Sequence, residues 1–164
     1  MLAQAIMFTI ATGDDGVRSD SDVLASIFWD EGKFSQNFPL HLPNGPDVFS
    51  SGSVYISIWP LATPMEMDPG GGPHIDYIQI TLNQDGGLFE GTDYWDILGV
   101  SVALMSGANL VLAAGNAIIN GAATAQAIAT QGSFFGVASA VPLAHLGDKS
   151  NLAFSGDPGN VNIF

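Results

Sequence analysis

Closely spaced acidic residues near the amino terminus are the first feature of this sequence that suggests a chemical role. The stretch TGDDGVRSDSD, residues 12–22, carries four closely spaced carboxylates: Asp14, Asp15, Asp20 and Asp22. Calcium binds about six to eight oxygens from carboxylates, backbone carbonyls and water. Gly13 and Gly16 can bend the backbone so that several carboxylates point to one place. The stretch therefore predicts a calcium site.

A second acidic segment can complete such a site. In TDYWDILG, Asp93 and Asp96 flank Trp95 immediately before an apolar alternating run. Loops at one end of a β-sandwich cluster in space although they are distant in sequence. We therefore expect Asp93 and Asp96 to approach the first acidic stretch. Trp95 and Arg18 are the candidates for binding a further ligand, and packing of Trp95 would fix the loop.

The alternative is that these aspartates form turns on an acidic surface, with no ion bound. Asp is a common turn residue, and Arg18 lies within the stretch, where it can neutralise one or two carboxylates. The spacing does not match an EF-hand, because the closing Glu is missing. The acidity also fits a high-salt habitat.

Other catalytic and metal chemistries have weaker support. The three histidines, His41, His74 and His145, lack the spacing of a zinc motif. FSSGS does not match the G-x-S-x-G motif of hydrolases. Cysteine is absent, which excludes disulfides and thiolate metal sites. We therefore expect no enzymatic activity.

Composition narrows the range of partners. The 164 residues are 47% hydrophobic and 12% charged, and the net charge is −13. Such a charge disfavours nucleic acid and anionic lipid as electrostatic partners. No apolar run is long enough to span a membrane, and no convincing signal peptide is visible. We expect an extracellular or cell-surface location and a partner that is a protein, a lipid or a glycan.

Short alternating segments predict an all-β fold. Apolar residues recur at every second position in Phe8–Ala11, 23–30, 54–59, 76–82 and 98–104, and turn signals separate these runs. Leu98, Val100, Val102 and Leu104 are expected to share one face. Residues 60–73 are rich in Pro and Gly and are expected to form a long surface loop. We predict an antiparallel two-sheet β-sandwich of about eight strands in a single domain, 1–164.

Residues 106–140 differ in composition, since Ala and Gly dominate and no residue is charged. The Ala content permits a helix over about 117–130, whereas alternation at 123–130 and the NG pair at 120–121 favour strands. An uncharged β-segment can pair with the sheet edge of another chain. The structural protomer of an extracellular or fibre-like surface assembly is therefore the alternative function, with self-association through residues 106–140.

Three segments of the sequence resemble a known family. FTIATGDDGVRSDSDVLASIFW is similar to the opening of bacterial PLAT-like (lipoxygenase-homology type) β-sandwich domains, and FEGTDYWDILGVSVAL is similar to a later D-x-W strand motif of that group. PLAHLGDKSNLAFSG resembles its closing segment. The resemblance implies an eight-stranded, non-catalytic binding or targeting module that is often calcium-dependent and acts beside enzymes. Residues 106–140 depart from the pattern. The resemblance assigns these residues to the calcium site: Asp14, Asp15, Asp20, Asp22, Asp93 and Asp96.

Overall fold

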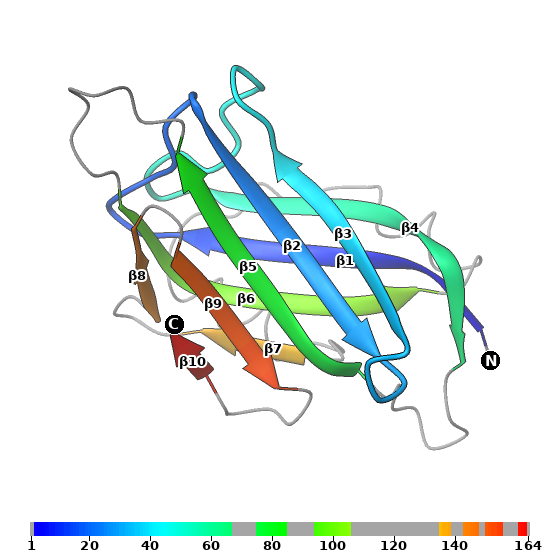
Figure 1. The fold of residues 1–164 in the computed structure, drawn as a ribbon. Helices are drawn as coiled ribbons and strands as arrows, with labels where there is room; N and C mark the ends of the chain where they lie inside the picture. Colours follow the sequence, from blue (N-terminus) through cyan, green and yellow to red (C-terminus); the bar gives the residue numbers. More distant parts are fainter. Residues whose placement is uncertain are drawn as a thin grey trace.

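The structure is a computed structural model that describes residues 2–66, 75–84, 94–105, 135–138, 143–147, 150–155 and 161–163. Every regular element in these residues is a β-strand. The strands form two antiparallel sheets that face each other as the layers of a sandwich (Figure 1). The predicted all-β sandwich is confirmed. The described residues contain no helix long and apolar enough to cross a membrane.

The first layer, sheet A, has its main strands in the order β4–β1–β6–β7. Their bounds are β1 (Leu2–Thr12), β4 (Val54–Glu66), β6 (Trp95–Met105) and β7 (Phe135–Ala138). The short strand β8 (Ala144–Leu146) pairs with the beginning of β6. β4 therefore lies at one edge of sheet A and β7 at the other.

The second layer, sheet B, has the order β10–β9–β5–β2–β3. Its strands are β2 (Ser21–Trp29), β3 (Phe34–His41), β5 (Ile75–Gln84), β9 (Ser150–Ser155) and β10 (Val161–Ile163). The strands β8 and β10 have only three residues each. When these two are left out, each described sheet has four strands, and the total of eight agrees with the prediction.

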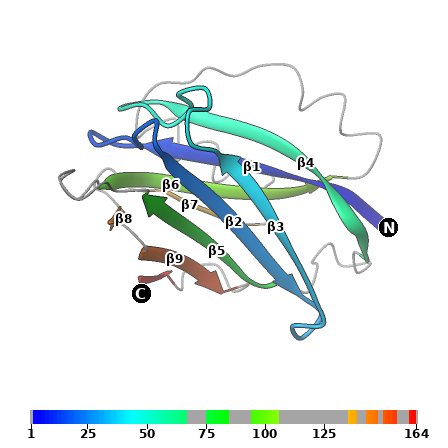
Figure 2. The ribbon, with the colours of Figure 1, turned by 45° about the horizontal axis from the view of Figure 1, so that its top comes forward.

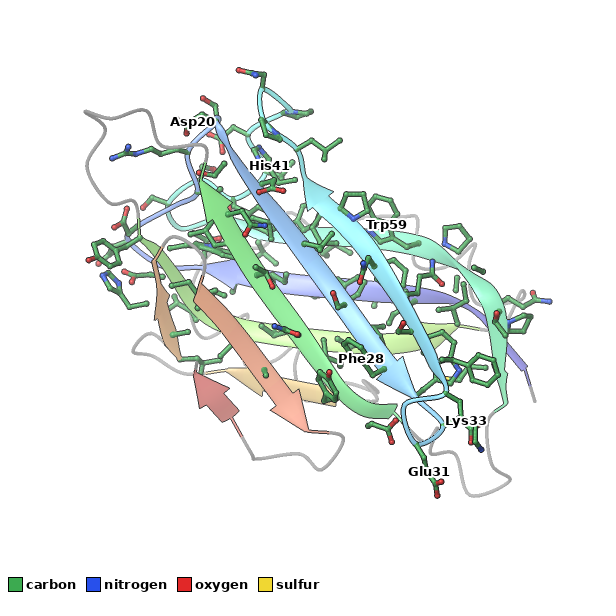
Figure 3. All side chains as sticks on the ribbon, in the orientation of Figure 1. Asp20, Phe28, Glu31, Lys33, His41 and Trp59 are labelled. Carbon is green, nitrogen blue, oxygen red and sulfur yellow. The ribbon has the colours of Figure 1, made fainter. Side chains whose placement is uncertain are left out.

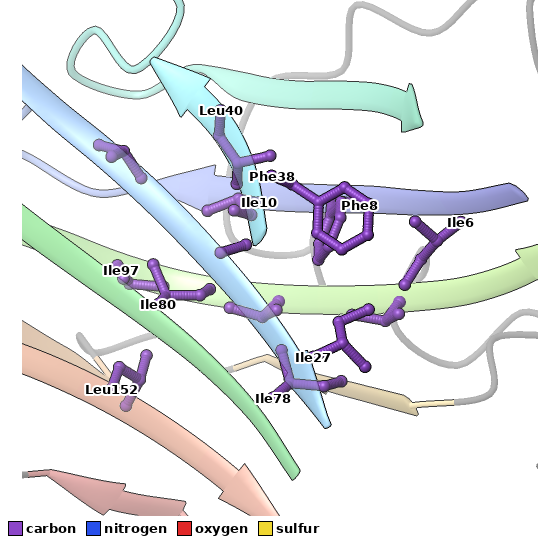
Figure 4. Packing of buried hydrophobic residues seen from close by; sticks show 14 of the residues in the cluster. Ile6, Phe8, Ile10, Ile27, Phe38, Leu40, Ile78, Ile80, Ile97 and Leu152 are labelled. Carbon is purple, nitrogen blue, oxygen red and sulfur yellow. The ribbon is translucent and has the colours of Figure 1, made fainter. Parts of the chain in front are cut away.

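One hydrophobic core fills the space between the sheets (Figure 4). Alternate residues of β1 and β2 face inward, because successive side chains of a strand point to opposite faces. Phe8 of sheet A meets Phe38 of sheet B edge to face, with ring centroids 5.2 Å apart. The predicted period of two is confirmed by the fully buried positions of β1, β2 and β5: Ile6, Phe8, Ile10, Val23, Ala25, Ile27, Ile80 and Leu82.

The register of β6 corrects one expectation. Leu98 was expected to share a face with Val100 and Val102, but it is only half-buried, whereas Ile97 is fully buried. The pairing with β1 shifts between Ala11 and Thr12, where one residue of β6 is passed over. Such a β-bulge changes which residues point inward, and the sequence pattern alone does not reveal its position.

The carboxyl-terminal half of β4 differs from a second expectation. Residues 60–73 were expected to form a loop, but β4 continues to Glu66 and pairs with the start of β1. Residues 67–73 lie outside the described residues. Pro60 and Pro64 are tolerated because β4 is an edge strand, where proline's missing N–H removes no ladder hydrogen bond. The pairing of β1 with β4 shifts register between Ala3 and Ala5, and this shift accommodates the extra residues of β4.

The edge strand β3 was not anticipated from the alternation pattern, and it also contains a proline, Pro39. Of the Ala/Gly-rich segment 106–140, the structure describes only Phe135–Ala138, which form β7 and pair with Gly99–Val102. The choice between helix and strand at 117–130 therefore lies outside the described residues.

Candidate functional site

The acidic stretch lies at one end of the sandwich, between β1 and β2. Asp20 and His41 mark this end in Figure 3, and the β2–β3 turn with Glu31 and Lys33 marks the opposite end. The β1–β2 loop (residues 13–20) contacts the β3–β4 loop (residues 42–53) through main-chain hydrogen bonds. Figure 2 shows the same arrangement from a second direction.

Backbone hydrogen bonds join the acidic loop to the beginning of β6. The Gly13 N–H donates to the Asp96 carbonyl at 2.7 Å, and the Asp96 N–H donates to the Asp15 carbonyl at 2.9 Å. These bonds bring the two acidic segments identified in the sequence together at one end of the molecule. The expected meeting of the two loops is therefore observed for the residues around Asp15 and Asp96.

The side chain of Trp95 packs in the core next to the junction between the acidic loop and β6. It is fully buried, and its Nε1–H donates to Thr12 Oγ1 at 3.1 Å. Its ring packs against Phe49 of the β3–β4 loop, with centroids 4.7 Å apart. Trp95 thus connects β6, the end of β1 and the neighbouring loop, and it holds the acidic loop in place from within the core.

Two glycines allow the close approach of these segments. A Cβ at Gly13 would lie 2.9 Å from the Asp96 Cβ, and a Cβ at Gly16 would lie 2.5 Å from the Phe49 carbonyl oxygen. The next residue, Val17, donates its N–H to the same Phe49 carbonyl at 3.1 Å. The backbone of the loop therefore lies in close contact with the neighbouring segments, whereas the side chains of Asp14 and Asp15 are exposed.

The Asp96 carboxylate has a histidine partner. His145 Nδ1, in the tautomer that carries its proton there, donates to Asp96 Oδ1. The Asp96 side chain is 13% exposed and that of His145 is 55% exposed. The His145 ring stacks on Tyr94, with centroids 4.4 Å apart and an interplanar angle of 13°. A cation bound by Asp96 would share this carboxylate with His145.

The remaining predicted residues are distributed around the junction. Asp20 is half-buried at the end of the loop, and Asp22 is half-buried within β2, opposite Asn83 of β5. Arg18 is exposed, and its carbonyl accepts a hydrogen bond from the Ser21 N–H. Asp93 lies outside the described residues. Within the described ranges, no three side chains of His, Cys, Asp or Glu form a group that could hold a metal ion. The six-aspartate site stays a prediction.

Sequence reasoning did not connect His145 and Tyr94 with this end of the molecule. His145 lies 49 residues from its partner Asp96. It reaches Asp96 because β8 pairs with the first residues of β6. No local spacing in the sequence signals this contact.

Comparisons with known proteins give little further information. No protein-family model matches the chain, and no curated protein matches it. Among solved structures, the chain is similar to one described as "Alpha Toxin from Clostridium Absonum", with 14% identity and a TM-score of 0.39. The match covers 99% of this chain and 31% of the toxin's chain. This chain therefore spans about a third of that protein's length, and a likeness at this level supports no statement about function.

Proposed function

We propose that this chain is a non-catalytic, PLAT-like binding module whose acidic β1–β2 loop and the start of β6 bind calcium. The observation that carries the proposal is the pair of backbone hydrogen bonds that join Asp96 to Gly13 and to Asp15. They place two acidic segments side by side, where carboxylate and carbonyl oxygens are the ligands that calcium prefers.

The position of the motifs adds support. The TGDD motif follows the first strand and leads into the second, as the resemblance to PLAT-like domains implies. Asp96, from the second motif, lies beside the first motif at the same end of the sandwich. A bound cation would order the loops and so present a recognition surface to a partner, which is the mechanism that we propose for the module.

Thermal unfolding in chelator, calcium and magnesium tests the calcium site. Because calcium binds the folded state, free calcium at about 100 times its Kd stabilises the fold by about 2.7 kcal/mol. For a domain of this size, that corresponds to a rise in Tm of roughly 5–10 °C. Magnesium should give a smaller rise, because it requires strict octahedral geometry and gives up water reluctantly.

Paired variants identify the ligands. Asp14→Asn with Asp15→Asn should abolish the calcium-dependent rise in Tm. Asp30→Asn with Glu31→Gln removes two charges at the opposite end of the sandwich and should leave the rise intact. Equal shifts with calcium, magnesium and sodium at matched ionic strength would reject the site. The acidic stretch would then be a set of turns on a charged surface.

The alternative function, a structural protomer of a surface assembly, has one supporting observation. Phe135–Ala138, from the Ala/Gly-rich segment, form β7 at the edge of described sheet A. Edge strands are templates for pairing with a second chain. Size-exclusion chromatography with light scattering separates the two functions, since a monomer at all concentrations would rule out the assembly.

A further inference from the structure

The outer face of sheet B carries a second set of side chains with binding chemistry. No described strand lies in front of β2 and β5 on this face (Figures 1 and 2). The inward residues of these strands form the core, so the alternate residues point outward. The register aligns these outward residues in rows that run across β3, β2 and β5.

One row consists of uncharged hydrogen-bonding groups. Ser26 of β2 lies between Asn37 of β3 and Gln79 of β5. The Ser26 hydroxyl donates to Asn37 Oδ1 at 2.8 Å, which orients that amide. Asn37 is exposed and Gln79 is half-exposed, and each amide has two N–H donors and a carbonyl acceptor. Neighbouring strands are about 4.8 Å apart, which is close to the length of one sugar unit in an extended glycan.

The next row contains an aromatic pair. Phe28 of β2 and Tyr77 of β5 stack with ring centroids 4.2 Å apart and an interplanar angle of 16°. Their separation is close to the strand spacing, so the two rings face each other across the strands and stand upright on the sheet. Phe28 has the small, exposed Ser35 on its other side, and Tyr77 is 38% exposed. This arrangement leaves ring surface for the apolar side of a sugar.

The charge of the face narrows the class of ligand. From Leu24 to Phe28, the outward residues of β2 and their partners on β3 and β5 are all uncharged. A surface for nucleic acid or anionic lipid would carry Lys or Arg, and one for a basic peptide would carry carboxylates. This uncharged part of the face, on a chain with a net charge of −13, is complementary to an uncharged ligand rich in hydroxyl groups. The next outward residue of β2, Asp22 opposite Asn83, lies beyond it, toward the acidic loop.

We propose that the outer face of sheet B binds an uncharged polysaccharide. A sugar ring packs against the Phe28–Tyr77 pair, and sugar hydroxyls exchange hydrogen bonds with the amides of Asn37 and Gln79. Figure 3 shows Phe28 on β2, toward the hairpin that carries Glu31 and Lys33. The inference rests on the proposed role as a binding module, but it requires no calcium, because the Phe28–Tyr77 pair lies toward the end of β2 opposite to the acidic loop.

Affinity electrophoresis of the full chain tests this inference. Native gels contain an uncharged soluble β-glucan or xylan, with polygalacturonate as the anionic counterpart. We expect retardation by at least one of the uncharged polymers and none by polygalacturonate. The retardation should persist in chelator, and it should change little with added sodium chloride, because no ion pairs are formed.

Substitutions locate the binding face. Tyr77→Ala should weaken binding about tenfold or more, and Gln79→Ala about three- to tenfold, the effect of one lost hydrogen bond. Tyr77→Phe keeps the ring and should retain most of the affinity. The matched control is Phe34→Ala: Phe34 is 40% exposed and stacks on Trp29, but it lies on the inward side of β3.

Three outcomes would overturn the inference. The first is that neither uncharged polymer retards the chain. The second is that Phe34→Ala weakens binding as much as Tyr77→Ala and Gln79→Ala do, with all variants folded by circular dichroism. The third is Tyr77-dependent binding to phosphatidylcholine vesicles without binding to polysaccharide, which would assign the face to lipid. Calcium-dependent Tm shifts report on the acidic loop separately, so either proposal can fail while the other holds.

Discussion

At the scale of single residues, two buried threonines of β1 differ in their hydrogen bonding. Thr12 accepts a hydrogen bond from Trp95 Nε1 at 3.1 Å. Thr9 Oγ1 is buried and has no hydrogen-bond partner in the part of the chain that the structure describes. A buried polar group without a partner costs free energy, whereas a paired one is stabilising. The same substitution should therefore have opposite effects at the two positions.

We predict that Thr12→Val lowers the free energy of unfolding by about 1–3 kcal/mol, because it leaves the Trp95 N–H buried without an acceptor. Thr9→Val is the matched control and should be neutral or stabilising by up to about 1 kcal/mol. Urea denaturation of both variants measures the difference. Equal destabilisation by the two substitutions would contradict the assigned Trp95–Thr12 hydrogen bond.

Gly16 provides a second test at this scale. A Cβ at this position would lie 2.5 Å from the Phe49 carbonyl oxygen, a backbone atom that cannot easily move away. We predict that Gly16→Ala destabilises the fold by about 1–3 kcal/mol, the usual cost of overpacking. Asp14→Ala in the same loop should change stability by less than about 0.5 kcal/mol in chelator, since its side chain is exposed. Thermal unfolding compares the two, and a neutral Gly16→Ala would show that the loop can relax.

At the scale of strands, one side chain bridges the two sheets at their β3 and β4 edges. Gln36 Nε2 donates to the Pro60 carbonyl at 2.9 Å, and the Ala62 N–H donates to Gln36 Oε1 at 2.8 Å. The amide thus satisfies two backbone groups of edge strand β4 from the opposite layer. This contact also protects part of the β4 edge from pairing with another chain.

We predict that Gln36→Ala increases the hydrogen-exchange rate of the Ala62 amide, because this N–H loses its acceptor and opens locally. Ser35→Ala, at the adjacent outward position, should leave that rate unchanged. Native-state hydrogen exchange resolved by residue distinguishes the two variants. An unchanged Ala62 rate in Gln36→Ala would indicate that another acceptor holds this end of β4.

At the scale of the whole molecule, the net charge of −13 opposes folding through repulsion among the carboxylates. Raising sodium chloride from about 10 mM to about 0.15 M shortens the Debye length from about 30 Å to about 8 Å. We predict that Tm rises over this interval in chelator, and that calcium raises it further at constant ionic strength. Differential scanning calorimetry measures both effects. A Tm that is independent of sodium chloride would show that the carboxylates are too widely spread to repel one another.

Local patterns in the sequence were sufficient for β1, β2 and β5 and their buried faces. The alternation around Phe8 and Ile10 determines which side chains face inward, because strand geometry has a period of two. The acidic loop was also visible locally, since Asp14 and Asp15 lie between two alternating runs. Pro60 and Pro64 misled the prediction for residues 60–66, because only the sheet order shows that β4 is an edge strand.

The all-β class, the inward residues of β1, β2 and β5 and the position of the acidic loop could therefore be predicted from the sequence alone. The contacts between distant residues became visible only in the folded molecule: Trp95 with Thr12, Asp96 with His145, and Gln36 with β4. This difference arises because side-chain direction within a strand follows from local geometry. Contacts between distant residues instead depend on strand order and on the bulge that shifts β6 against β1.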